Sequence, residues 1–165
     1  MSDIGEYLRL TAQELERAGQ DPTWAWNHIE DVREGEEFTE PPPTEARYYH
    51  TYVEWSLYDL LLRRAGFPVD VSHGEERLSY EDPSERGYGY LTAERVRVAA
   101  DALADLPYDL LAARADLDEM TRAGLCAPGH DAAATLAGAR HLYEGLVEFF
   151  TAAARAQDAV LVWQE

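Results

Sequence analysis

Short apolar runs recur along the chain and predict three β-strands. The runs cover residues 4–10, 87–91 and 158–163 and are rich in Tyr, Leu and Val, which is typical of strands buried in a sheet. The first two runs each lead into Leu-Thr-Ala and an acidic segment of helical character. This likeness extends over about ten residues and then stops. It indicates a strand-to-helix turn that is used twice, because a duplicated domain would repeat over a whole structural unit.

Apolar residues spaced by three or four positions predict helices between the strands. Thr11 and Glu14 form the Thr-x-x-Glu pattern of a capping box at the start of the first helix. Gly35 is expected to end the second helix, and the three prolines within residues 36–45 predict a loop after it. The predicted helices cover the segment after Thr11, residues 21–35, 46–64, the segment after Thr92, 107–114, 116–123 and roughly 131–156.

Together these elements predict an α+β fold: a single helix-rich domain over residues 1–165, with a small sheet of about three to four strands. A fourth strand would begin the segment 69–87, which otherwise predicts a loop. A chain of 165 residues with 46% hydrophobic residues is large enough to bury a core. Its apolar runs are far too short to cross a bilayer, so we expect no membrane partner.

The chain is strongly acidic, and its cations are all of one kind. It carries 32 acidic and 14 basic residues, every basic one an arginine, for a net charge of −18. This charge disfavours nucleic acid as a partner, because binding requires cations that displace counterions from phosphates. The same charge would attract a basic protein and speed its association. It also serves solubility, so both a partner and a well-solvated surface remain open.

Cysteine and lysine usage excludes several kinds of chemistry. Cys126 is the only cysteine, so an intrachain disulfide and a cysteine-based zinc cluster are excluded. His130 follows Cys126 by four residues and could serve as its base. A reactive thiolate also requires an electropositive setting, which the net charge of −18 disfavours. The lack of lysine excludes Schiff-base chemistry and a P-loop lysine. The first residues show no secretory signal, and we expect a cytoplasmic protein of a bacterium.

Candidate catalytic and metal-binding groups are few. His28, His50 and His141 each precede an acidic residue by one helical turn, a spacing that can support a metal site in a helical bundle. In so acidic a chain the pattern is common, and ligand geometry would have to decide. Adjacent acids such as Glu36 and Glu37 are interpreted as solvated loop charges. We therefore predict no catalytic residue, no bound metal and no cofactor.

Aromatic side chains provide the remaining candidates for a binding surface. Trp24 and His28 lie one turn apart on a predicted helix, and residues 46–61 contain four Tyr, one Trp and one His. Large rings dominate the burial of cores, but one helix cannot bury every side, so a core role and a partner surface both remain open. If the surface is used, the residues predicted to bind are Trp24, His28, His50, Tyr52 and Trp55.

Three stretches carry a resemblance to a known family. They are D-x-x-W-x-x-x-H at 21–28, GYGYLTAERVRVAADAL at 87–103 and LVEFFTAAARAQDAVLVWQ at 146–164. In this order the chain resembles the YfbM-like family of small bacterial cytosolic proteins, domain of unknown function 1877. The segments DVREGEE at 31–37 and LCAPG at 125–129 depart from the family pattern, so a site built on them would not carry over. The resemblance implies an α+β fold and a bacterial setting, and it implies no established activity.

Two hypotheses of function follow. The first is a non-catalytic cytosolic binding protein that recognises another protein, a basic one in the manner of immunity proteins. The second is a small-molecule-binding protein or an enzyme with a pocket around Trp24, His28 and the 46–64 helix. An exposed acidic and aromatic face would favour the first, and a closed pocket with convergent His and carboxylate groups would favour the second.

Overall fold

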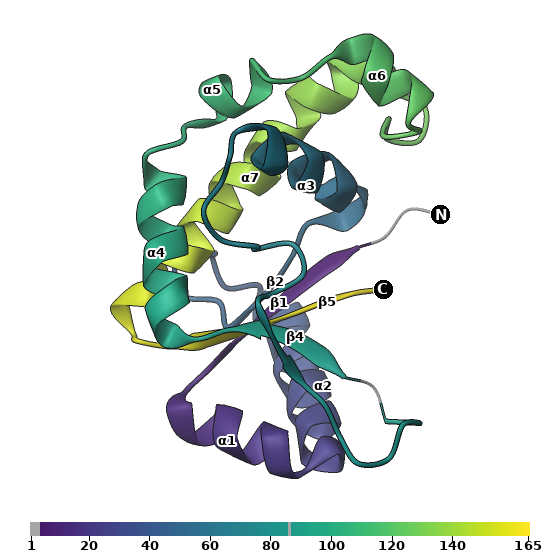
Figure 1. Cartoon of the computed structure of the whole chain (residues 1–165). Helices are drawn as coiled ribbons and strands as arrows, with labels where there is room; N and C mark the ends of the chain where they lie inside the picture. Colours follow the sequence, from purple (N-terminus) through teal and green to yellow (C-terminus); the bar gives the residue numbers. More distant parts are fainter. Residues whose placement is uncertain (1–3, 86) are drawn as a thin grey trace.

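Five antiparallel strands form one sheet, in the order β2-β1-β5-β4-β3 (Figure 1). The computed structural model describes residues 4–85 and 87–165. The first and last strands pair over their whole length, from Gly5 opposite Gln164 to Leu10 opposite Ala159. The strands are β1 (Gly5–Leu10), β2 (Tyr48–His50), β3 (Glu76–Leu78), β4 (Tyr88–Leu91) and β5 (Ala159–Gln164).

Helices cover both faces of this sheet, so the predicted α+β fold is confirmed. Helices α1 and α2 lie on one face, and α3 to α7 lie on the other (Figure 1). Among the described residues, no helix is both long and apolar enough to cross a bilayer. The helices are α1 (Ala12–Gln20), α2 (Pro22–Thr39), α3 (Trp55–Arg64), α4 (Ala93–Ala104), α5 (Tyr108–Ala112), α6 (Leu117–Arg122) and α7 (Ala132–Arg155), with a 3-10 turn η1 (Tyr52–Glu54) before α3.

Alternate side chains of β1 pack into two separate cores, one on each face of the sheet. Tyr7 faces α7, where its ring centroid lies 6.4 Å from that of Phe149 and 5.9 Å from that of Phe150. Leu8 faces the opposite way and packs in the core that includes Ile29 of α2. Successive residues of a strand point to opposite faces, and both faces of this sheet are covered. This explains why the first five residues of β5, Ala159 to Trp163, are all apolar.

The predicted strands and helix caps are confirmed where the signals are local. Residues 4–10, 87–91 and 158–163 correspond to β1, β4 and β5. The Thr11 hydroxyl accepts from the Glu14 N–H at 3.2 Å, and the Glu14 carboxylate accepts from the Thr11 N–H at 3.0 Å. These reciprocal bonds complete the capping box that begins α1.

The sheet has five strands where about three to four were predicted. Both additional strands lie at its edges and are three residues long. Strand β2 takes the start of the predicted 46–64 helix, because pairing with β1 overrides the helical spacing of its side chains. Helix α3 therefore begins only at Trp55. Strand β3 forms at Glu76 instead of at the start of 69–87, because it pairs there with β4.

Helix α2 continues past Gly35, which was predicted to end it, and stops at Thr39. Gly35 has open space around it, and a glycine inside a helix costs only about 1 kcal/mol relative to alanine. The helix ends at Glu40, whose φ of 46° is left-handed, directly before Pro41. Residues 36–39 of the loop predicted over 36–45 thus lie on a helix that reaches the edge of the sheet.

Candidate functional site

A groove lies at the edge of the sheet, where β2 is flanked by the end of α2 and the middle of α7. Its volume is about 620 Å³. Two segments far apart in the sequence supply its charge. We call it the acidic groove, because five glutamates line it: Glu36, Glu37, Glu40, Glu144 and Glu148.

The carboxylates of the acidic groove are poorly neutralised. Within the part of the chain that the structure describes, no arginine lines the groove. Glu144 lies 3.6 Å from Arg140 on its own helix. Glu37, Glu40 and Glu148 are exposed and form no ion pair with any described residue. Like charges gathered in one concave surface focus a negative potential that attracts cations.

Glu36 is held against the strand edge by backbone hydrogen bonds. Its carboxylate accepts from the N–H of Arg47 at 2.6 Å and from the N–H of Tyr48 at 2.9 Å. Tyr48 also contacts Glu6, a buried carboxyl of β1, through its hydroxyl. Burial raises the pKa of Glu6, although the hydrogen bond from Tyr48 opposes this shift. The wall of the groove on this side is therefore fixed in place.

Tyr49 joins β2 to α7 on the other side of the groove. Its hydroxyl donates to the carbonyl of Leu142 at 2.6 Å, and its ring stacks near Phe149 with centroids 5.7 Å apart. Gly145 permits this approach, because a Cβ there would lie 2.4 Å from the Tyr49 hydroxyl oxygen. Burial raises the pKa of Tyr49 far above its ordinary value. The ring is thus a neutral, fixed wall.

His50 and Tyr52, two of the residues predicted to bind, line the acidic groove. Their ring centroids are 4.1 Å apart, and the rings are nearly perpendicular at 73°. Tyr52 has a left-handed φ of 48° and is 52% exposed. Burial lowers the pKa of His50, and the nearby charge of Glu37 partly opposes this shift. His50 is therefore neutral at pH 7 and can accept a hydrogen bond.

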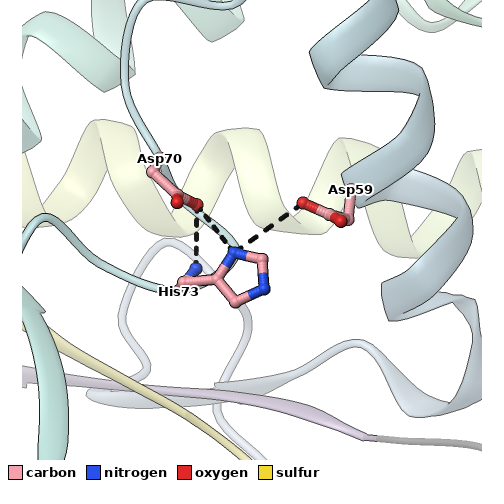
Figure 2. A group of neighbouring side chains, drawn as sticks. All are labelled: Asp59, Asp70 and His73. Carbon is pink, nitrogen blue, oxygen red and sulfur yellow. Dashed lines mark hydrogen bonds and ion pairs between the residues drawn. The ribbon is translucent and has the colours of Figure 1, made fainter.

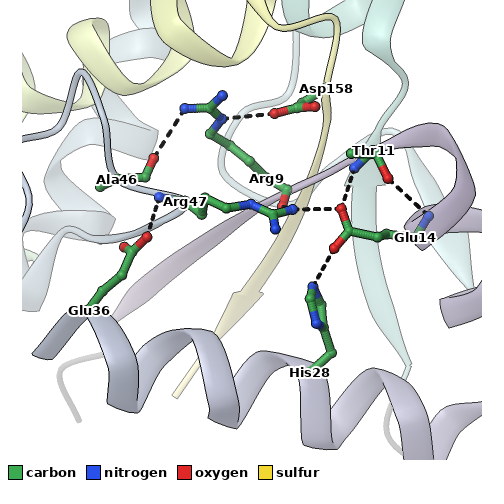
Figure 3. Close-up of polar contacts among 8 residues, drawn as sticks. All are labelled: Arg9, Thr11, Glu14, His28, Glu36, Ala46, Arg47 and Asp158. Atoms are coloured by element: carbon green, nitrogen blue, oxygen red, sulfur yellow. Dashed lines mark hydrogen bonds and ion pairs between the residues drawn. The ribbon is translucent and has the colours of Figure 1, made fainter.

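Trp24 and His28 lie outside the acidic groove. Their rings stack with centroids 4.6 Å apart and planes 12° apart, and the Arg17 guanidinium lies 4.8 Å from the Trp24 ring. His28 Nε2 is 2.8 Å from the Glu14 carboxylate, without the alignment of a hydrogen bond (Figure 3). Burial lowers the pKa of His28, while Glu14 opposes the shift. These contacts connect α1 to α2.

Arg47 links this pair of helices to the strand edge (Figure 3). Its guanidinium donates to the Glu14 carboxylate at 2.7 Å and to the Arg9 carbonyl at 2.9 Å. Partial burial alone would raise the pKa of Glu14, but hydrogen bonds from Arg47 and Thr11 lower it to about 2. Because the Arg47 N–H also binds Glu36, one residue connects both α1 and the C-terminal part of α2 to the sheet.

Trp55 belongs to the core. Its indole N–H donates to the Ser72 carbonyl at 3.2 Å, and its ring meets that of His73 edge-on with centroids 5.2 Å apart. It is buried and does not line the acidic groove. The structure therefore brings together His50 and Tyr52, and it places the other predicted binding residues elsewhere.

A second cluster of polar groups lies where α3 meets the following loop, and we call it the turn cluster (Figure 2). His73 Nδ1 lies 3.1 Å from Asp70 and 3.9 Å from Asp59. Asp70 already accepts from the N–H groups of Ser72 at 3.1 Å and His73 at 2.9 Å. Arg63 neutralises Asp59 at 2.8 Å. These contacts account for the turn cluster as a stabilised turn.

Sequence reasoning missed the glutamates of the acidic groove. Glu36 and Glu37 were interpreted as solvated loop charges, and Glu144 only as a neighbour of His141. They meet because α2 extends beyond its predicted end and because β2 replaces the start of a predicted helix. The acidic run before the three prolines was the one local signal, and nothing in the sequence ties it to α7.

Comparison with known proteins covers nearly the whole chain. A family model described as "Domain of unknown function (DUF1877)" matches residues 1–163. The resemblance inferred from the three stretches is thus confirmed. No curated protein and no solved structure matches the chain.

Proposed function

The chain belongs to the DUF1877 family, whose function is unknown, and we propose that it is a non-catalytic binding protein whose acidic groove receives a basic segment of another protein. The observation that supports this proposal is the convergence of five glutamates on a groove that no described arginine lines. A cationic segment would relieve the repulsion between these carboxylates. The net charge of −18 would also speed its approach.

Exposed aromatic rings beside the groove support a protein as the partner. Phe38 is 91% exposed and lies in the sequence between Glu37 and Glu40. Tyr52 is 52% exposed within the groove itself. Aromatic anchors next to charged residues are typical of the energetically important parts of protein interfaces.

The size of the groove supports a second candidate, a small cationic ligand. Its volume of about 620 Å³ falls within the roughly 300–1,000 Å³ of pockets that bind small molecules. The groove includes His50 and Tyr52 but not Trp24 or His28, around which the sequence predicted a pocket. Calorimetric titration with the polyamine spermine tests this candidate, and saturable binding that depends on the groove glutamates would favour it.

We further propose that the protein acts in the cytoplasm of a bacterium. Cys126 is a free cysteine, which suits a reducing compartment. No membrane and no nucleic acid is proposed as a partner, because the acidic surface would repel both phosphates and anionic headgroups.

Two variants with the same loss of charge separate the groove from the rest of the surface. The groove variant removes four exposed groove carboxylates and leaves Glu36 on its backbone bonds. It consists of Glu37→Gln, Glu40→Gln, Glu144→Gln and Glu148→Gln. The control variant removes four exposed carboxylates around α4 and α6 that do not line the groove. It consists of Glu94→Gln, Asp101→Asn, Asp105→Asn and Asp118→Asn.

The test is affinity capture from host lysate at low and at physiological salt, followed by identification of the captured protein. We expect the native protein and the control variant to capture a basic protein more strongly at low salt, because exposed charges are screened by ions. The groove variant should lose this capture. Equal capture by the groove and control variants would contradict the proposal, since the net charge would then account for the binding.

A further inference from the structure

Strand β2 is an edge of the sheet, and its outer backbone groups face the acidic groove. The N–H of Arg9 donates to the carbonyl of Arg47 at 2.8 Å, and the N–H of Thr51 donates to the carbonyl of Gly5 at 2.9 Å. These bonds set the alternation of the antiparallel ladder. The residues between them, Tyr48 and His50, therefore direct their N–H and C=O groups away from β1.

One of these outward groups, the Tyr48 N–H, already has a hydrogen-bond acceptor in the place where a neighbouring strand would supply one. The Tyr48 N–H donates to the Glu36 carboxylate at 2.9 Å, as it would donate to the carbonyl of another strand. The His50 N–H makes no hydrogen bond with any other described residue. An edge strand with such groups is a template for pairing with another chain.

The glutamates lie on both faces of this edge. Glu37 and Glu40 come from the end of α2 on one face, and Glu144 and Glu148 come from α7 on the other. Successive side chains of an extended chain point to opposite faces. A strand added beside β2 would thus direct each side chain toward carboxylates, whichever face that side chain is on.

From this geometry we propose that the basic segment binds as an extended strand along the outer edge of β2, and that it is an uninterrupted run of arginine or lysine residues. The inference rests on the proposed function and adds to it the conformation and the sequence pattern of the ligand. Main-chain hydrogen bonds to the N–H and C=O of His50 and to the C=O of Tyr48 would fix the register, and the glutamates of both faces would select the charge. A segment with a basic residue at every position would form ion pairs on both faces of the edge. A segment with a basic residue at every second position would form them on one face only.

Three synthetic peptides with blocked ends test the two parts of the proposal. The first has a run of consecutive arginines flanked by serines. The second has the same composition with arginine and serine alternating. The third repeats the first with every backbone amide of the arginine run N-methylated, which removes the strand hydrogen-bond donors of both edges and keeps every charge. We expect the first to bind about tenfold more tightly than the third, a difference of about 1.4 kcal/mol. The alternating peptide should also bind more weakly than the first.

Two substitutions at one position test the role of the β2 backbone. His50→Pro removes the outward N–H without removing a ladder bond, since proline is tolerated at such edge positions. His50→Ala keeps the N–H and removes only the side chain, so it is the matched control. His50→Pro should bind the consecutive peptide about tenfold more weakly than His50→Ala does, which corresponds to about 1.4 kcal/mol. Both should bind the N-methylated peptide equally, and circular dichroism checks that both are folded.

The outcomes separate this inference from the proposed function. If the methylated and unmethylated peptides bind equally and the groove variant binds neither, strand addition is overturned while the basic-segment groove stands. Equal affinities for the consecutive and alternating peptides would overturn the requirement for charge on both faces. If none of the peptides binds at low salt, the proposed function itself is refuted.

Discussion

Replacing Gly145 with alanine should destabilise the protein, whereas the same change at Gly138 on the same helix should not. A Cβ at Gly145 would lie 2.4 Å from the hydroxyl oxygen of Tyr49 and 3.0 and 3.2 Å from two of its ring carbons. Tyr49 cannot retreat freely, because its hydroxyl binds the Leu142 carbonyl and its ring packs against Phe149. A Cβ at Gly138 would meet nothing within 4 Å.

The magnitudes follow from two opposing effects. Alanine in place of glycine favours a helix by about 1 kcal/mol at either position. Overpacking of a well-filled site costs about 1–3 kcal/mol, and weakening the Tyr49 hydrogen bond costs about 1 kcal/mol more. We therefore expect Gly145→Ala to lower the free energy of unfolding by about 1–3 kcal/mol and Gly138→Ala to raise it by up to about 1 kcal/mol. Each 1 kcal/mol should shift the Tm by about 2–4 °C.

Urea unfolding followed by circular dichroism measures both changes. Adding Tyr49→Phe to the Gly145→Ala variant removes the closest contact, so the two substitutions should be less than additive. If Gly145→Ala is as stable as Gly138→Ala, the close packing of β2 on α7 that shapes one wall of the acidic groove is refuted.

Three further predictions concern charge and metal. Glu14 has a pKa of about 2 in the folded protein against an ordinary 4.5, so its stabilising effect is present above pH 4.5 and is lost as the pH falls toward 2. Arg47→Ala should reduce the free energy of unfolding that is lost between pH 4.5 and 2 by about 1 kcal/mol after solvent screening. An unchanged acid limb of the Tm–pH curve would contradict the role of Arg47. His28→Phe should keep the stack on Trp24 and lessen the loss of stability below pH 6.5, because the lowered pKa of His28 makes proton uptake favour the unfolded chain. Melts across pH 5–8 check this, and an identical slope would refute it. Zinc or EDTA should leave the Tm unchanged, because Arg63 and backbone N–H groups occupy the turn cluster; a clear rise with zinc would show a metal site there.

The parts of the fold that the sequence predicted correctly depend on local chemistry. The cap at Thr11 acts within a few residues, and the run at 158–163 is buried on both faces wherever it pairs. Strand β2 is different, because Tyr48–His50 are extended only through pairing with a strand far away in the sequence. The prediction that α2 ends at Gly35 was wrong for a related reason. The prolines after Glu40 end the helix, and a solvent-exposed glycine does not.

The candidate site was predicted only in part, for the same physical reason. His50 and Tyr52 were recognised because aromatic residues concentrate in one segment. The carboxylates around them come from α2 and α7, which no spacing rule connects. Trp24 and His28 show the converse, because the two rings of this predicted pair stack on each other beside Glu14 and lie outside the acidic groove.

The position of β5 has a consequence for how the chain acquires its structure during synthesis. Residues 159–164 form the central strand, yet they leave the ribosome after every other element described here. Until then β1 with β2 and β3 with β4 are separate pairs, and two-stranded pairs are marginal in water. The sheet can therefore close only after β5 has left the exit tunnel. A nascent chain interrupted before residue 158 would lack any persistent sheet and would be exposed to chaperones and proteases.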